Sequence, residues 1–330
     1  MLALPEQGMR KSVLKHNCRW TALFDWIEAS VLLTQERVSK MEVVDHLCDQ
    51  SIYIAQESSE YLDDETSESG ITKQAFAYEA LDVVWEQIEV RQSWLGDGAT
   101  CRVVDDVIEP LVDWVKSPGF SFCMVLALTE LYPTWEGGFL TRGHVEQGDL
   151  FEKLSMEALL KHGWEVKLIG WSPIRSLQFK DVVGAVADFV NEPYPVEAMI
   201  DLHAERNDAG LDLVCCQRFG DDRAAIPSFF VQCASGKNWK DKTHTPDIDL
   251  WADLITFASR PKKALAMPFS FEDGEAFFKS AKEVRGILFD RYRLLGVNCR
   301  ETQWLTVQLR DELVAWLRPR IAGLLKYDGA

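Results

Sequence analysis

The sequence lacks the patterns that usually identify zinc proteins, disulfide-rich proteins and membrane proteins. Its eight cysteines include no CxxC pair, so neither a zinc cluster nor a disulfide framework is expected. Its six histidines show no HxH or HExxH spacing, which argues against a zinc enzyme. No run of about 18 apolar residues appears, and the first residues lack the order of a signal peptide. We therefore expect a cytoplasmic chain without a membrane partner.

A nucleotide-binding P-loop and a general excess of basic residues are also missing. Without GxxxxGK[ST], the chain is not expected to hydrolyse ATP through a P-loop, and no GxSxG elbow is present. The net charge is −17, and it is divided unevenly. Residues 1–146 hold 25 acidic and 11 basic side chains, whereas residues 147–330 hold 27 and 24. A polyanion is repelled by the first half, so nucleic acid is expected to bind the second.

The chain has 330 residues, of which 47% are hydrophobic, and this is enough for two domains with buried cores. We place the boundary near 135–146, giving an acidic, mostly helical domain over 1–140 and a second domain over 141–330. Apolar residues at helical spacing predict the first domain's helices over 20–36, 71–92, 103–115 and 119–131. An acidic, serine-rich stretch over 58–70 indicates an exposed loop.

The second half alternates helical and strand patterns, which predicts an α/β domain around a central mixed sheet. A helix over 147–163 can begin at Asp149 and end at Gly163. Two β-rich runs separated by GDDRAAIP predict a hairpin over 211–219 and 228–234. Further strands are expected over 164–171 and 262–269, and further helices over 179–192, 247–258, 273–285 and 302–318.

Three short segments carry polar residues in positions suited to chemistry. GDLFEKL places Glu152 in the first turn of a helix, NDAGLDLV places Asp212 at the opening of a strand, and FFVQCASGKNW places Gln232 late in the next strand. Each residue also has a plain structural interpretation, as a surface glutamate, a turn aspartate and a buried amide with a partner. Their order and their helix and strand contexts favour a shared site.

These segments resemble the PD-(D/E)xK nuclease superfamily, and particularly its Mrr-like restriction branch, over about residues 147–268. The matching elements are a G-x-x-FE helix over Gly148–Glu152, a Gly-Trp-x-Val strand over Gly163–Val166, a D-x-G-x-D turn over Asp208–Asp212 and part of a (Glu/Gln)-x-Lys strand end over Gln232–Ala234. The resemblance implies a restriction-endonuclease-like core and a role in bacterial restriction or anti-phage defence.

The resemblance also implies a divalent cation, because phosphodiester hydrolysis needs an activated water and relief of phosphate charge. Mg²⁺, or Mn²⁺ in its place, prefers oxygen ligands. The expected ligands are the side chains of Glu152, Asp212 and Gln232 and the main-chain carbonyl of Cys233. Glu205 is expected to support this set from outside it.

The sequence departs from the family at the lysine that would orient the attacking water, where Ala234 stands. Lys237, three residues further on, is the nearest candidate to replace it. Nearby lysines are expected to contact phosphates, although such a run is more often simply a solvated face. They are Lys240, Lys242, Lys262 and Lys263.

The sequence thus predicts a Mg²⁺-dependent endonuclease acting on nucleic acid, with DNA as the expected substrate. The acidic first domain would bind a protein partner or restrain the nuclease, and a homo-oligomer is compatible with the sequence. Two alternatives remain open. In one, the missing lysine marks a nuclease-like fold that has lost catalysis and serves as a nucleic-acid-binding or assembly subunit. In the other, residues 147–268 form an unrelated α/β domain.

Overall fold

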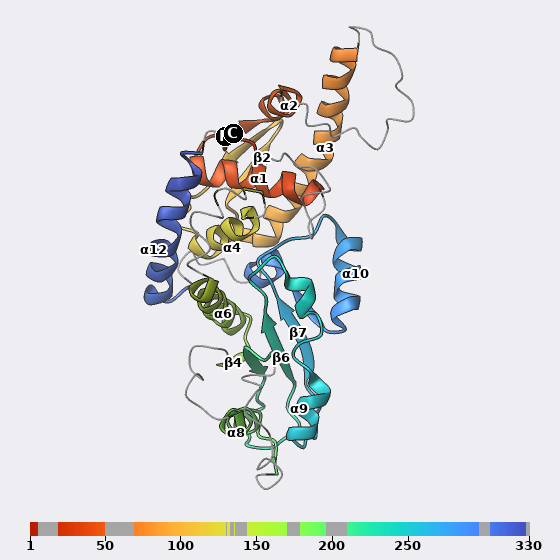
Figure 1. Cartoon of the computed structure of the whole chain (residues 1–330), viewed down its shortest axis with the longest axis vertical. Helices are drawn as coiled ribbons and strands as arrows, with labels where there is room; N and C mark the ends of the chain where they lie inside the picture. The colour runs from red at the N-terminus through yellow and green to blue at the C-terminus, as the bar shows by residue number, and fades with distance from the viewer. Residues whose placement is uncertain are drawn as a thin grey trace. The chain divides into compact units, whose positions relative to one another are not determined.

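The computed structural model describes two compact units of the chain (Figure 1). The first contains residues 1–139 and 314–330, and the second contains residues 140–313. The residues described are 1–5, 19–49, 69–129, 131–132, 135, 144–169, 179–195, 210–296 and 304–327. Within these ranges, no helix combines the length and the apolar character needed to cross a membrane. The predicted loop lies mostly outside them, over 58–68, and its last two residues begin a helix.

The first unit combines helices with a small antiparallel sheet. Its helices are α1 (Arg19–Thr34), α2 (Lys40–Asp49), α3 (Ser69–Leu95) and α4 (Pro118–Leu128), with a 3₁₀ turn, η2, at Gly96–Gly98. Its strands are β1 (Val38–Ser39), β2 (Cys101–Val104) and β3 (Val107–Pro110), in the order β1-β3-β2. The helices expected over 20–36, 71–92 and 119–131 are therefore confirmed.

The helix predicted over 103–115 is wrong, because β2 and β3 form a hairpin there. β-branched side chains occupy both strands and pair Val103 with Ile108 and Val104 with Val107. Asp105 adopts φ +53° in the connecting turn, a conformation that short polar side chains tolerate and a helix does not. The apolar spacing of this segment fits two short strands as well as it fits a helix, and the turn decides between them.

The last part of the chain belongs to the first unit, which corrects the expectation that residues 141–330 form one domain. The final helix, α12, spans Val307–Leu324. Trp316 packs edge-on against Phe122, with ring centroids 4.7 Å apart, and Tyr327 packs against Tyr132 at 5.4 Å. These aromatic contacts bury side chains of the C-terminal segment against the first unit. No local sequence pattern indicates that packing.

The second unit is built on a mixed five-stranded sheet in the order β4-β5-β6-β7-β8. β4, β5 and β6 are antiparallel, whereas β6, β7 and β8 are parallel. The strands are β4 (Glu165–Leu168), β5 (Leu213–Cys216), β6 (Ser228–Cys233), β7 (Lys262–Ala266) and β8 (Ile287–Phe289). The predicted mixed sheet and the β5–β6 hairpin are confirmed, while β8 was not foreseen.

Helices cover both faces of this sheet. They are α6 (His144–Lys161), α8 (Phe179–Val190), α9 (Ile248–Leu254), α10 (Gly274–Val284) and α11 (Arg291–Leu295), with a 3₁₀ turn, η4, at Trp239–Lys242. Val214 and Phe230 share a buried cluster with α8 and α9, and Phe230 meets Trp251 of α9 edge-on at 5.6 Å. Strand residues alternate in direction, so Phe229 and Cys233 face the other side, where α6 packs.

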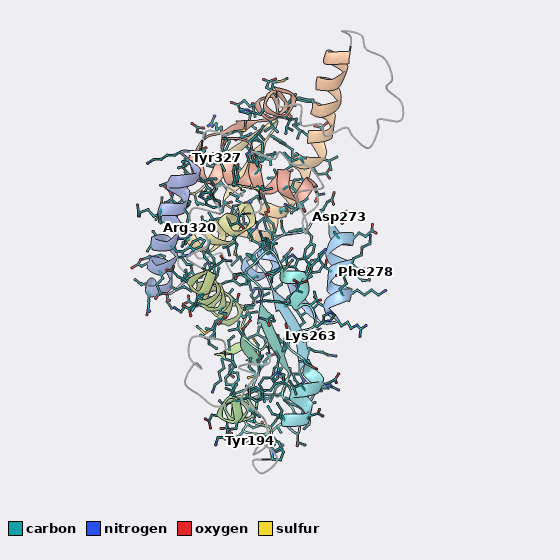
Figure 2. All side chains as sticks on the ribbon, in the orientation of Figure 1. Tyr194, Lys263, Asp273, Phe278, Arg320 and Tyr327 are labelled. Atoms are coloured by element: carbon teal, nitrogen blue, oxygen red, sulfur yellow. The ribbon has the colours of Figure 1, made fainter. Side chains whose placement is uncertain are left out.

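Polar contacts hold the segment that follows α8. Glu192, which is buried just after α8, accepts hydrogen bonds from the amides of Ala225 at 3.1 Å and Ala258 at 3.0 Å. Tyr194 closes the turn beside α8, and its hydroxyl lies 3.0 Å from the place where a Cβ on Gly184 would stand (Figure 2). A glycine there lets the tyrosine approach the helix.

The helix that carries Glu152 begins earlier than the sequence indicates. We expected Asp149 to cap it, but α6 starts at His144, so Glu152 lies in the third turn and not in the first. Asp149 lies within the helix and forms an ion pair with Lys153 at 2.8 Å, the i,i+4 spacing of helical neighbours. The end of the helix is as predicted, with Gly163 at φ +86°.

Candidate metal centre and its lysine

The candidate site is organised around Asp212, the residue directly before β5. Its amide donates to the carbonyl of Val231 at 2.9 Å, and its carbonyl accepts from the amide of Ile169 at 2.8 Å. These bonds fix its backbone between the two neighbouring strands, and only 5% of the residue is exposed. Asp212 bonds to Val231, the residue that also pairs with Leu213, so the chain bulges where β5 begins and Asp212 lies beside the end of β6.

The Asp212 carboxylate is bound by two donors from the end of β6. Its Oδ2 accepts from the backbone amide of Cys233 at 2.5 Å and from Nε2 of Gln232. The same Nε2 donates to the Cys233 carbonyl at 3.2 Å. One amide nitrogen therefore lies between a carboxylate oxygen and a main-chain carbonyl oxygen, in surroundings that attract positive charge.

The other end of the Gln232 amide contacts Thr245, which follows η4. Thr245 Oγ1 lies 3.0 Å from Gln232 Oε1 and 2.9 Å from the carbonyl of Lys242. Gly210 makes room for this contact: a Cβ there would lie 2.6 Å from Thr245 Cβ and 3.0 Å from Gln232 Oε1. Gly210 also has φ +70°, so the turn before Asp212 requires glycine for two separate reasons.

Glu152, on α6, is close enough to the Cys233 thiol at the end of β6 to affect its pKa. Burial raises the pKa of this thiol well above its ordinary value, and the carboxylates of Asp212 and Glu152 raise it further, while Lys242 acts in the opposite direction. The Cys233 thiol therefore lies within electrostatic reach of Asp212, Glu152 and Lys242. A thiol that stays neutral is a poor nucleophile, which argues against attack by Cys233.

Lys242 is the lysine that the structure brings to the site. Its Nζ lies 3.5 Å from the carbonyl of Cys233, and its side chain is half-buried. Lys237, which we expected in this position, lies on the surface in the turn after β6. Lys242 takes this position because the turn η4 brings the chain back towards the end of β6.

The turn η4 is itself held in place by packing and by a lysine. Trp239 is buried, with its ring centroid 6.0 Å from that of Phe271. Lys263 on β7 (Figure 2) donates from Nζ to the carbonyl of Thr243 at 2.7 Å. Lys263 therefore supports the turn, although the sequence suggested a phosphate contact. Lys240 and Lys262 are exposed.

The donor atoms present fit a hard divalent cation, with one restriction. Among the residues that the structure describes, no three or more His, Cys, Asp and Glu side chains gather as a metal site. The carboxylates of Asp212 and Glu152 would therefore need the Gln232 amide oxygen and the Cys233 carbonyl. All four donors are oxygen atoms, the ligand type of Mg²⁺ and Mn²⁺. Gln232 now presents its nitrogen, so its amide would have to turn before it could ligate.

Sequence reasoning missed Thr245 and the place of Lys242. A threonine three residues after a lysine is too common a pattern to indicate either contact. Gly210 is the sequence feature that could have indicated the Thr245 contact, since a glycine close before a strand suggests that another segment approaches the backbone there. Glu205 and Asp208 lie outside the residues that the structure describes.

Comparisons with known proteins add nothing to this geometry. No protein-family model matches the chain, and neither the curated proteins nor the solved structures contain a match to it.

We predict that Gly210→Ala destabilises the fold more than Gly220→Ala. Both glycines have positive φ, +70° and +82°, but a Cβ at 220 would meet nothing within 4 Å. Gly220→Ala should therefore cost about 1 kcal/mol from backbone strain alone, and Gly210→Ala about 1–3 kcal/mol more from overpacking. Urea denaturation of both variants measures the difference. Equal losses would show that Thr245 yields to a methyl group.

We predict that Cys233 makes stability fall at alkaline pH. The folded state keeps the thiol neutral because its pKa is raised, whereas the unfolded chain releases the proton near the ordinary value of 9.0. The unfolded state then binds fewer protons, so the free energy of unfolding decreases as pH rises above about 8. Between pH 8 and pH 10, the wild type should lose about 1.4 kcal/mol more than Cys233→Ala. Denaturation at both pH values tests this, and parallel losses would contradict it.

Proposed function

We propose that the second unit is a Mg²⁺- or Mn²⁺-dependent nuclease with a restriction-endonuclease-like core, and that it cleaves phosphodiester bonds of DNA. The observation that carries this proposal is the convergence of Asp212, the Gln232 amide and the Cys233 carbonyl, with the Lys242 ammonium group on the same carbonyl. The mixed sheet that supports them has a helix carrying Glu152 on one face. A role in restriction or anti-phage defence belongs to this proposal.

The residues of the chain have distinct roles in this proposal. Asp212, Glu152, Gln232 and the Cys233 carbonyl hold the cation, which supplies charge that offsets the negative phosphate. Lys242 places a second positive charge beside the same carbonyl and orients the attacking water. Because its ammonium group arrives from η4, Lys242 supplies the charge that the strand position occupied by Ala234 does not.

Exposed basic residues near η4 suit the phosphates on either side of the scissile bond. Lys240 and Lys262 are exposed, and the Nζ of Lys240 lies 5.7 Å from the ring centroid of Trp239. Exposed lysines contribute binding that depends on salt and carries no base specificity. We therefore assign them to binding of the backbone and assign Lys242 to the reaction.

Plasmid cleavage with Mg²⁺ or Mn²⁺ tests the proposal through two matched pairs of variants. Asp212→Ala should lower kcat at least about 100-fold, because it removes the central carboxylate. Asp221→Ala is its control, since Asp221 lies beyond β5 and pairs with Arg223 at 2.8 Å. Lys242→Ala should lower kcat about 100-fold, whereas Lys240→Ala should mainly raise KM and leave kcat within about threefold.

The two remaining interpretations give different results in the same assay. Cleavage that survives Asp212→Ala unchanged would remove the proposed site. If the wild type binds DNA but cleaves neither DNA nor RNA with either cation, the catalytically inactive binding or assembly subunit becomes the better account. Loss of activity in Lys237→Ala but not in Lys242→Ala would restore the lysine expected from the sequence.

We also propose that the first unit binds a basic, amphipathic segment of a protein partner through α3. Val83, Val90 and Trp94 are 55%, 36% and 53% exposed, and their spacing places them along one side of the helix. Glu86 and Glu89 are exposed beside them. An apolar stripe with acidic neighbours is complementary to a helix with apolar and basic residues.

Fluorescence anisotropy with a labelled, helical Leu/Lys peptide checks this face. Trp94→Ala should weaken binding about tenfold, as expected for an aromatic anchor. Asp253→Ala removes an exposed charge from the second unit and should change the affinity less than twofold. Equal weakening by both variants would mean that the peptide responds only to the overall charge of the chain.

A further inference from the structure

The Gln232 amide lies between two unlike environments, and Thr245 forms one of them. The nitrogen of the Gln232 amide faces two oxygen atoms, Asp212 Oδ2 and the Cys233 carbonyl. Its oxygen faces the Thr245 hydroxyl at 3.0 Å. The amide is buried, so each orientation has to be satisfied by protein groups.

Thr245 has one hydroxyl proton and two acceptors within reach. Its Oγ1 lies 3.0 Å from Gln232 Oε1 and 2.9 Å from the Lys242 carbonyl, so only one of these oxygens receives the proton at a time. If the amide turned by half a rotation, its NH₂ group would donate to Thr245. The hydroxyl proton would then belong to the Lys242 carbonyl alone, and both contacts would be satisfied.

The turned amide creates a cluster of oxygen atoms on the other side. Gln232 Oε1 would then face Asp212 Oδ2 and the Cys233 carbonyl, an arrangement that is repulsive without a cation and favourable with one. The rotation itself is accessible, because the last torsion of glutamine is broad and roughly two-fold. Thr245 can serve both orientations, since a hydroxyl donates or accepts as required.

We propose that Thr245 is a positioning residue that allows the Gln232 amide to reverse when a divalent cation binds. The inference rests on the proposed nuclease function, because it takes Asp212 and Gln232 as cation ligands. It adds that the same hydroxyl connects the amide to the main chain of Lys242. Cation binding therefore frees a proton donor for the turn that carries the candidate lysine.

Two threonine variants separate the hydroxyl from the packing. Thr245→Val keeps the shape and removes the hydroxyl. The present orientation then loses one donor to Gln232 Oε1 but keeps both contacts of Nε2, whereas the turned NH₂ group loses its acceptor, so the variant favours the orientation without the cation. The Kd for Mn²⁺, measured by calorimetry on the full chain, should rise at least about tenfold. Thr245→Ser keeps the hydroxyl and should leave the Kd within about threefold of the wild type. Thermal unfolding confirms that both variants are folded.

A measurement on the wild type needs no variant in the site. With ¹⁵N-labelled glutamine, the chemical shifts of the Gln232 side-chain NH₂ group depend on the atoms that accept its hydrogen bonds. Gln308 is exposed, and the signal lost in Gln308→Ala serves as the comparison for exposed glutamines. Saturating Mg²⁺ should move the carboxylate-bonded proton of Gln232 upfield, because its acceptor changes to a hydroxyl. Signals that remain in place while the cation binds would overturn the amide reversal.

The outcomes separate this inference from the proposed function. Mn²⁺ binding that is equal in Thr245→Val and Thr245→Ser overturns the role of the hydroxyl and leaves the nuclease proposal intact. A wild type that binds no divalent cation removes the metal-dependent function and the inference with it. Binding by the wild type, weakened only by Thr245→Val and accompanied by the NMR shift, is the result expected.

Discussion

The pairing of β5 with β6 is the constraint on which the rest of the second unit depends. It brings Asp212 beside the end of β6, where the Cys233 amide donates to the Asp212 carboxylate. A slip of one residue would send every side chain of one strand to the opposite face. The aspartate would then leave the site, and Phe230 would leave its cluster with Trp251. Packing on the two faces of the sheet therefore fixes the chemistry at its end.

A buried carboxylate at the end of a strand is costly unless donors surround it. At Asp212 the cost is offset by a backbone amide and a side-chain amide. The same bonds compete with any cation for the carboxylate. In the proposed nuclease, an oxygen-ligand site that is already satisfied internally would bind Mg²⁺ weakly and release it readily.

The strands and the candidate residues were predictable from the sequence where the patterns were strong. The β5–β6 hairpin was predictable because two β-rich runs flank a turn sequence, and the end of α6 was predictable from Gly163. The β2–β3 hairpin was not, because short β-branched segments also fit a helical spacing. The arrival of Lys242 depends on the path of η4, which is fixed by Trp239 against Phe271 and by Lys263 on Thr243. Such contacts between distant residues have no local signature.

The first unit is discontinuous in the sequence, since it closes only with residues 314–330. Synthesis proceeds from the N-terminus at about 5–20 residues per second, and domains tend to fold as they emerge. Residues 140–313 are therefore complete before the segment with Trp316 and Tyr327 leaves the ribosome. During that interval Phe122 and Tyr132 have no aromatic partner from the C-terminal segment. The acidic unit, although it is begun first, is therefore completed after the second unit.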